Sequence, residues 1–126
     1  MRKIPGLFLA IFLFMACSKS NDNGGGGNHN CDFSVPAINA PADGTVKYEA
    51  NITGTGTVSS LVIKNSNGAD SAINSPTLPF QTTLNIASGT AIAISAKGST
   101  NGGQIEIKYT FNGAGTLQED KEECGN

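Results

Sequence analysis

The three cysteines of this 126-residue chain are the side chains whose chemistry is easiest to interpret. Cys17 ends an apolar run, Cys31 follows a glycine tract, and Cys124 stands close to the last residue of the sequence. A cysteine sulfur can be modified covalently, can pair with another as a disulfide, or can bind a metal. The neighbours of each cysteine indicate which of these it does.

Residues 1–16 have the pattern of a secretory leader. Arg2 and Lys3 supply the positive start, residues 7–15 the apolar stretch, and Ala16 the small residue before the cleavage point. A bilayer-spanning helix needs about 20 apolar residues, so this run is too short to cross a membrane. We therefore expect a signal peptide.

The four residues Phe14-Met15-Ala16-Cys17 resemble the lipobox of bacterial lipoproteins. In that class the cysteine is lipidated on its sulfur and becomes the new N-terminus after cleavage, and two or more acyl chains give stable anchoring. The resemblance implies that Cys17 is the lipidation site and that the protein is anchored in the cell outer membrane, facing either the periplasm or the cell surface. Ordinary secretion is the alternative.

Polar and glycine residues fill the stretch after the lipidated cysteine. Residues 18–30 cannot bury apolar area, so we expect residues 17–30 to be a flexible tether and residues 31–126 to be the folded domain. His29 has no second histidine or carboxylate cluster beside it, and we interpret it as a solvated linker residue instead of a metal ligand.

Cys31 and Cys124 are then the two remaining thiols, in an oxidising compartment. They stand at the two ends of the expected domain, and such a pair is expected to form a disulfide. A metal site would need two more soft ligands, and a catalytic cysteine would need a histidine that residues 31–126 lack.

Composition favours a β-rich domain without affinity for nucleic acid. Eight Lys and Arg against ten Asp and Glu leave a net charge of −2 and no basic stripe to neutralise phosphates. The chain has 16 glycines, and after Cys31 its apolar residues are mainly aliphatic. Short alternating runs between turn signals, without helical periodicity, are typical of an all-β sandwich.

About seven strands are expected. The clearest is residues 104–112, where four apolar residues alternate with polar ones. A change of parity near Ser59 predicts a bulge, and Asn65-Ser66-Asn67-Gly68 predicts a hairpin turn. The other expected strands are residues 45–53, 57–64, 80–86 and 90–97, with a last edge at 115–120. An immunoglobulin-like sandwich is favoured over a closed barrel, because the disulfide ties strand ends together and the chain is short for a lipocalin.

Four segments in order resemble the extracytoplasmic domain of the MmpS (mycobacterial membrane protein small) family. They are Val46-Lys47-Tyr48-Glu49, Gly54-Thr55-Gly56-Thr57-Val58, Thr77-Leu78-Pro79-Phe80 and Gly103-Gln104-Ile105-Glu106-Ile107. Members of that family have a small β-sandwich behind a membrane anchor and act as accessory partners of lipid-exporting transporters. The resemblance implies the same fold and a transporter or other membrane protein as partner. Here the anchor is a lipidated cysteine in place of a transmembrane helix, and a cysteine that the family often carries near Ile105 is absent.

No catalytic constellation is evident, so we do not expect an enzyme, a cofactor or a metal. The domain has no histidine, no carboxylate pair with acid and base spacing, and no G-x-S-x-G motif. Lys121 interrupts the acidic run of residues 119–123, which therefore resembles a solvated end more than a calcium site.

We expect a non-enzymatic accessory or interaction domain, with a cell-surface glycan- or ligand-binding module as the alternative. The loop of residues 73–80 is the candidate contact with a partner, through Leu78, Pro79 and Phe80, although Leu78 and Phe80 also suit a plug for one end of the sandwich. The absence of tryptophan makes sugar stacking less favourable. Asp70-Ser71-Ala72 resembles a bacterial O-glycosylation acceptor, with Ser71 as the modified residue.

Overall fold

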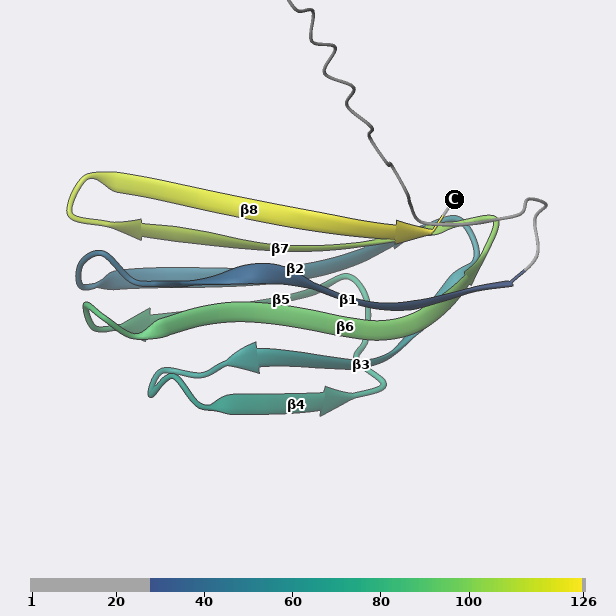
Figure 1. The fold of residues 1–126 in the computed structure, drawn as a ribbon, viewed down its shortest axis with the longest axis horizontal. Coiled ribbons are helices and arrows are strands. Elements are labelled where there is room, and N and C mark those ends of the chain that lie inside the picture. Colours follow the sequence, from purple (N-terminus) through teal and green to yellow (C-terminus); the bar gives the residue numbers. More distant parts are fainter. Residues whose placement is uncertain (1–27, 126) are drawn as a thin grey trace, which may run out of the picture.

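The computed structural model describes residues 28–125, which form two antiparallel four-stranded sheets stacked as a β-sandwich (Figure 1). Within this range no helix is long and apolar enough to cross a membrane. The eight strands are β1 (Asn28–Asn39), β2 (Gly44–Thr53), β3 (Gly56–Lys64), β4 (Asp70–Asn74), β5 (Phe80–Ile86), β6 (Ala91–Asn101), β7 (Gln104–Gly113) and β8 (Thr116–Gly125). The all-β prediction is confirmed, with eight strands where about seven were expected.

Sheet A has the strand order β1-β6-β3-β4, and sheet B has the order β5-β2-β7-β8. The sheets stack with β1 beside β8 and β6 beside β7. In an immunoglobulin constant domain the first two strands pair with each other, whereas here β1 pairs with β6 and β2 lies in the other sheet. The sandwich is therefore established, and its strand order does not confirm the immunoglobulin-like subtype.

The core lies between the two sheets and follows from the alternation of apolar residues along the strands. In β7 the inner positions are filled by Ile105, Ile107, Tyr109 and Phe111, none more than 2% exposed, while the residues between them face outward. Sheet A supplies the facing layer, with Leu61, Ile92 and Ile94 among its fully buried side chains. The same alternation places every second residue of β2 and β7 on the outer face of sheet B.

The folded region begins earlier than the sequence indicated. Asn28–Asn30, assigned to the tether, are the first residues of β1 and pair with Ser99–Asn101 of β6. Strand pairing satisfies main-chain groups whatever the side chains are, so these polar residues join the sheet while their side chains stay exposed. The predicted loop at residues 73–80 is also shorter, because Ile73 and Asn74 end β4 and Phe80 starts β5.

The predicted irregularities are present. The pairing of β3 with β6 shifts register between Val58 and Ser60, which is the expected bulge. The Asn65–Gly68 turn connects β3 to β4: the Asn65 side-chain oxygen accepts hydrogen bonds from the main-chain N–H groups of Asn67 and Ala69. Gly68 occupies the left-handed region at φ 81°, which glycine adopts without steric cost.

The predicted disulfide between Cys31 and Cys124 is present. Cys31 lies in β1, the edge strand of sheet A, and Cys124 lies in β8, the edge strand of sheet B. The bond therefore links the two sheets at one open side of the sandwich, close to where β1 begins and β8 ends.

Candidate functional site

Some of the predicted functional residues lie outside the described part of the chain. The signal peptide of residues 1–16, the lipidation site Cys17 and residues 18–27 of the tether belong to this group. The other candidates, Ser71 and the segment Leu78–Phe80, lie at or near the side of the sandwich formed by β4 and β5.

Ser71 is half-buried in β4 and pairs in register with Ile63 of β3, which is 5% exposed. Residues in register share a face of the sheet, so the Ser71 side chain is directed toward the inside of the sandwich. A glycosyl-transferring enzyme needs an accessible hydroxyl, and this placement does not favour Ser71 as an acceptor.

Leu78 and Phe80 are partly buried and pack against the core, whereas Pro79 between them is exposed. The segment therefore closes one end of the sandwich with two side chains and presents the third to solvent. Of the three predicted contact residues, Pro79 is therefore the most accessible to a partner.

Replacing Leu78 with serine is expected to lower the free energy of unfolding by about 1–2 kcal/mol, because a half-buried leucine loses part of its transfer free energy. Thr77→Ser at the exposed neighbouring position is the matched control and should change stability by less than about 0.5 kcal/mol. Urea denaturation of both variants measures the difference. A Leu78→Ser protein as stable as the wild type would show that Leu78 is free to contact a partner.

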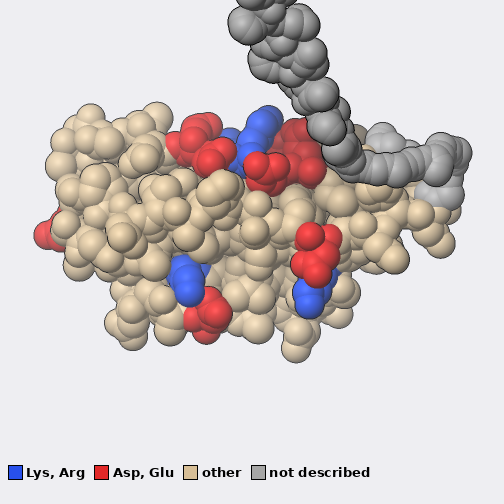
Figure 2. Space-filling view, viewed as in Figure 1, with Lys and Arg blue, Asp and Glu red and all other residues tan. Residues whose placement is uncertain are grey.

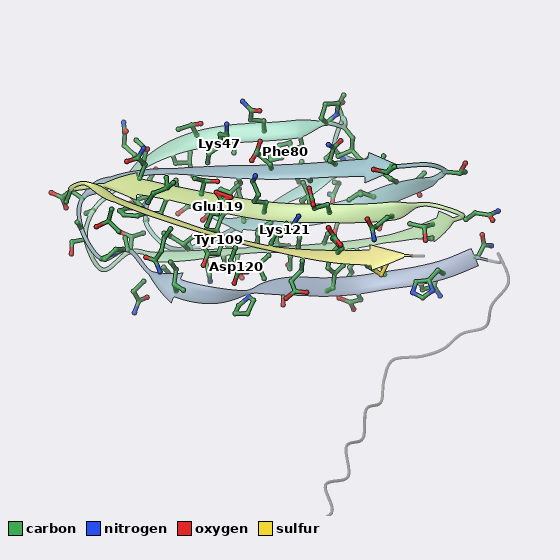
Figure 3. All side chains as sticks on the ribbon, turned by 90° about the horizontal axis from the view of Figure 1, so that it is seen from above. Lys47, Phe80, Tyr109, Glu119, Asp120 and Lys121 are labelled. Carbon is green, nitrogen blue, oxygen red and sulfur yellow. A yellow bond between two sulfur atoms is a disulfide. The ribbon has the colours of Figure 1, made fainter. Side chains whose placement is uncertain are left out.

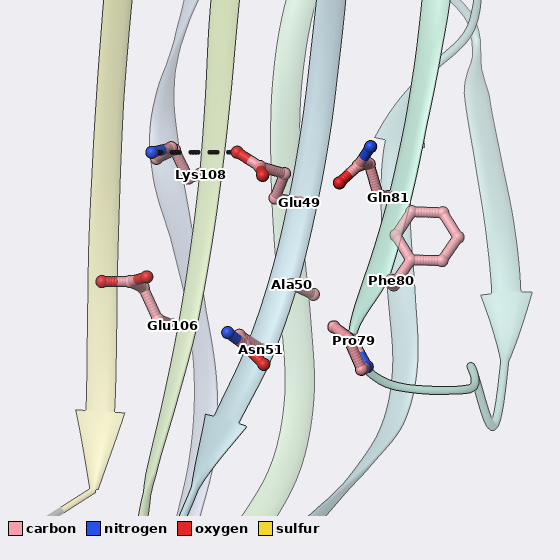
Figure 4. Close-up of a pocket in the computed structure, with 8 residues that line it drawn as sticks. All are labelled: Glu49, Ala50, Asn51, Pro79, Phe80, Gln81, Glu106 and Lys108. Atoms are coloured by element: carbon pink, nitrogen blue, oxygen red, sulfur yellow. Dashed lines mark ion pairs between the residues drawn. The ribbon is translucent and has the colours of Figure 1, made fainter.

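Pro79 borders a shallow depression of about 250 Å³ on the outer face of sheet B (Figure 4). Its lining comes from three adjacent strands, β5, β2 and β7, and from the connection before β5: Glu49, Ala50, Asn51, Pro79, Phe80, Gln81, Glu106 and Lys108. The Ala50 side chain is 1% exposed and faces the core, so β2 contributes only main chain at this point between the outward side chains of Glu49 and Asn51. Pairing of Ala50 with Phe80 and with Ile107 brings the three strands into this register.

The charged side chains around the depression, Glu49, Glu106 and Lys108, belong to a cross-strand ladder of opposite charges on β2, β7 and β8. The Lys108 ammonium lies 3.8 Å from a carboxylate oxygen of Glu49 and 3.8 Å from one of Glu119. The Lys121 ammonium donates a 3.1 Å hydrogen bond to Glu106 and lies 3.6 Å from Glu123. Figure 3 shows Lys47, Glu119 and Lys121 on these strands.

Because its lysines and carboxylates pair with one another, this ladder leaves little net charge for a partner to meet. The hydrogen bond from Lys121 holds the pKa of the Glu106 carboxyl below its usual value and raises the pKa of Lys121. In the space-filling view, acidic and basic side chains gather together along β7 and β8 (Figure 2). The outer face of sheet B is therefore a mixed and largely compensated surface, unlike the single-sign patches that attract nucleic acid or ions.

No group of three or more His, Cys, Asp or Glu side chains in residues 28–125 is arranged to hold a metal ion. His29 is exposed on β1, where it pairs in register with Thr100. No titratable cluster in the described strands has the geometry of an acid and base pair around the depression, since each of its carboxylates faces a lysine.

No protein-family model, curated protein or solved structure matches this chain. The resemblance to the MmpS extracytoplasmic domain therefore remains a prediction from four short segments. Sequence reasoning identified Pro79 and Phe80 but missed the charged and amide residues of the depression. The alternation of apolar and polar residues along β2 and β7 indicates that these residues face outward. The sequence does not reveal which strands are neighbours, and so does not bring the residues together.

Proposed function

We propose that this protein is a lipid-anchored lipoprotein of the cell outer membrane whose β-sandwich is a non-enzymatic interaction domain. The domain docks onto a membrane protein partner through the depression on the outer face of sheet B. The observation that carries the proposal is the convergence of exposed Pro79, Asn51 and Gln81 with the carboxylates of Glu49 and Glu106 in one concave surface.

The place of the depression in the sandwich suits a partner in the same membrane. Ile52 of β2 pairs with Ile105 of β7, and Ile105 pairs with Cys124 of β8. Asn51 and Glu106 stand one residue from that row, so the depression lies in the half of sheet B nearest the disulfide. The disulfide is also close to where β1 begins, so the expected tether from Cys17 joins the domain at this half.

The chemistry of the depression suits a polar protein surface. Asn51 and Gln81 each offer an amide with both donors and an acceptor, and Glu49 and Glu106 can accept hydrogen bonds from a partner's lysine or arginine. The paired charges around them would determine which partner fits and how it is aligned, and would contribute less to the binding affinity. An envelope transporter or another integral membrane protein with an extracytoplasmic surface is the partner class.

The orientation of Phe80 favours a protein over a glycan. Figure 4 shows the Phe80 ring on the opposite side of β5 from the Gln81 side chain, and the ring packs against the core. Phe80 lines the depression, but its ring is directed toward the core, so the depression offers little aromatic surface on which a sugar ring could stack.

Asn51→Arg is expected to lower the yield of a captured membrane partner by about tenfold or more, because a long cationic side chain would fill the depression. The full chain is crosslinked in its native membranes, purified, and its crosslinked proteins are quantified. Ser34→Arg on the exposed outer face of sheet A is the matched control and should capture as much as the wild type.

Two results would contradict the docking proposal. Equal capture by the Asn51→Arg and Ser34→Arg proteins would show that the depression is not the contact. Crosslinks to glycans alone, with no protein partner, would instead support the glycan-binding alternative.

A further inference from the structure

The two sheets have four edge strands, and these differ in how well they are protected from pairing with another chain. The edges are β1 and β4 in sheet A and β5 and β8 in sheet B. An edge strand presents unpaired N–H and C=O groups, and natural proteins protect such edges with charges, prolines, bulges or short strands.

Three of the four edges carry such protection. β8 has five consecutive charged residues, Glu119–Glu123, and its Asp120 and Glu122 are on the inner face opposite Tyr109 and Ile107. β1 contains Pro36 and a register shift between Val35 and Ile38. β4 is only five residues long.

β5 has none of these devices. Its seven residues, Phe80–Ile86, include no charged residue and no proline, and its pairing with β2 is continuous in register. The Phe80 label in Figure 3 marks this strand near one margin of the sandwich, and β5 stands at the end of the strand order of sheet B. The strand is thus an unprotected template for antiparallel pairing.

We propose that β5 pairs with β5 of a second copy of this chain, antiparallel and about a twofold axis through Thr83. In this register Gln81 meets Asn85 of the other copy, Thr83 meets Thr83, Phe80 meets Ile86, and Thr82 meets Leu84. Such an isologous contact requires one surface that is complementary to itself.

Both faces of β5 satisfy that requirement. The exposed residues Gln81, Thr83 and Asn85 share the outer face, where amide meets amide and hydroxyl meets hydroxyl. Thr–Thr and aromatic to β-branched pairs are among the cross-strand pairs that stabilise a sheet. On the inner face Phe80 and Leu84, which one copy leaves half-buried, gain apolar or β-branched neighbours.

The opposite edge strand of sheet B, β8, is unsuited to pairing with a second copy, and the comparison shows why β5 is the edge that pairs. The same operation on β8, centred on Lys121, would place Glu119 against Glu123 and Asp120 against Glu122. Like charges directly opposite each other destabilise a sheet. Pairing through β5 instead produces a continuous eight-stranded sheet made of sheet B from each copy, with both depressions on one outer face.

The oligomeric state of the full chain in mild detergent tests the proposal by analytical ultracentrifugation across a range of protein concentrations. A concentration-dependent monomer–dimer equilibrium is expected. Thr83→Lys places two ammonium groups at the twofold axis and should raise the dimer dissociation constant by about tenfold or more. Gln118→Lys, the same change of charge on the exposed β8 edge, should leave it unchanged.

A crosslink tests the register itself. In full chain carrying Cys17→Ser, Thr83→Cys places two thiols at the axis, within the Cα separation that a disulfide spans, and should give a dimer on a non-reducing gel after mild oxidation. Asn85→Cys is the control: the two copies of residue 85 would stand about 13 Å apart along the strands and should not crosslink.

A protein that stays monomeric at every concentration overturns the proposal, as does a Thr83→Lys protein that dimerises as the wild type does. Equal crosslinking through Thr83→Cys and Asn85→Cys overturns the proposed register. If Thr83→Lys fails to fold, the uncharged Thr83→Cys variant decides the question. Although Gln81 belongs to both surfaces, none of these results decides whether a partner docks at the depression, which the Asn51→Arg variant tests separately.

Discussion

The Cys17→Ser variant is expected to take up no palmitate and to leave the detergent phase. The diacylglyceryl group needs a thiol, and Cys17 is the one cysteine in or next to the lipobox-like segment. The polar stretch that follows it has no apolar residues that could hold the protein at a bilayer. Metabolic labelling and detergent phase partition in a Gram-negative host measure both effects.

The matched control removes the other two cysteines. Cys31→Ala with Cys124→Ala should keep full labelling, because those sulfurs are bonded to each other in the folded domain. A wild-type protein that takes no label, together with a Cys17→Ser protein that stays in the membrane, would contradict the lipid anchor.

The same double variant is expected to lose at least about 4–5 kcal/mol of stability, the part that comes from the crosslink. Its two cysteines are 93 residues apart, and in the chain-entropy model a crosslink over a loop of this length restricts the unfolded chain by that amount. Denaturation in guanidinium chloride compares the double variant with the wild type, with the slope checked for two-state behaviour.

Reduced wild-type protein provides the control for this measurement. Cys31 is 3% exposed, so its replacement by alanine removes packing as well as the bond. Reduction with dithiothreitol removes the bond alone, and the stability lost on reduction is the entropic part. A loss of less than about 1 kcal/mol on reduction would show that the crosslink does little to restrict the unfolded chain.

Strands with one buried face could be predicted from the sequence, because alternation follows directly from burial. β7 is the best example: residues 104–112 were expected and Gln104–Gly113 are observed. β1 was missed because its bulge near Pro36 changes the parity of its apolar residues. β4 was missed because it is short and only Ile73 supplies an apolar inner side chain.

The sequence predicts a last strand that ends earlier than the observed β8, for a related reason. Its inner positions hold Gln118, Asp120 and Glu122, which are exposed because the strand lies at the open side of the sandwich. Without a buried face there is no alternation, and the expected strand stopped at Asp120 although the observed one continues to Gly125.

The disulfide prediction is confirmed, whereas contact through Leu78, Pro79 and Phe80 stays a prediction, and the depression beside them could not be found from the sequence, for a physical reason. Pairing two remaining thiols needs no knowledge of the fold. The depression requires the neighbourhood of β5, β2 and β7, which places Gln81, Asn51 and Glu106 together although they are far apart in sequence. Strand order depends on non-local contacts that no single segment encodes.

The position of the disulfide also determines how the domain responds to mechanical load. A pull on the chain ahead of Asn28 can peel only residues 28–30 from β6 before it reaches Cys31. From there the tension has a second, covalent path through the disulfide into β8 and sheet B, in addition to the main chain of β1. A load applied between the N-terminal side and the outer face of sheet B would therefore reach that sheet without having to cross the hydrogen bonds of sheet A.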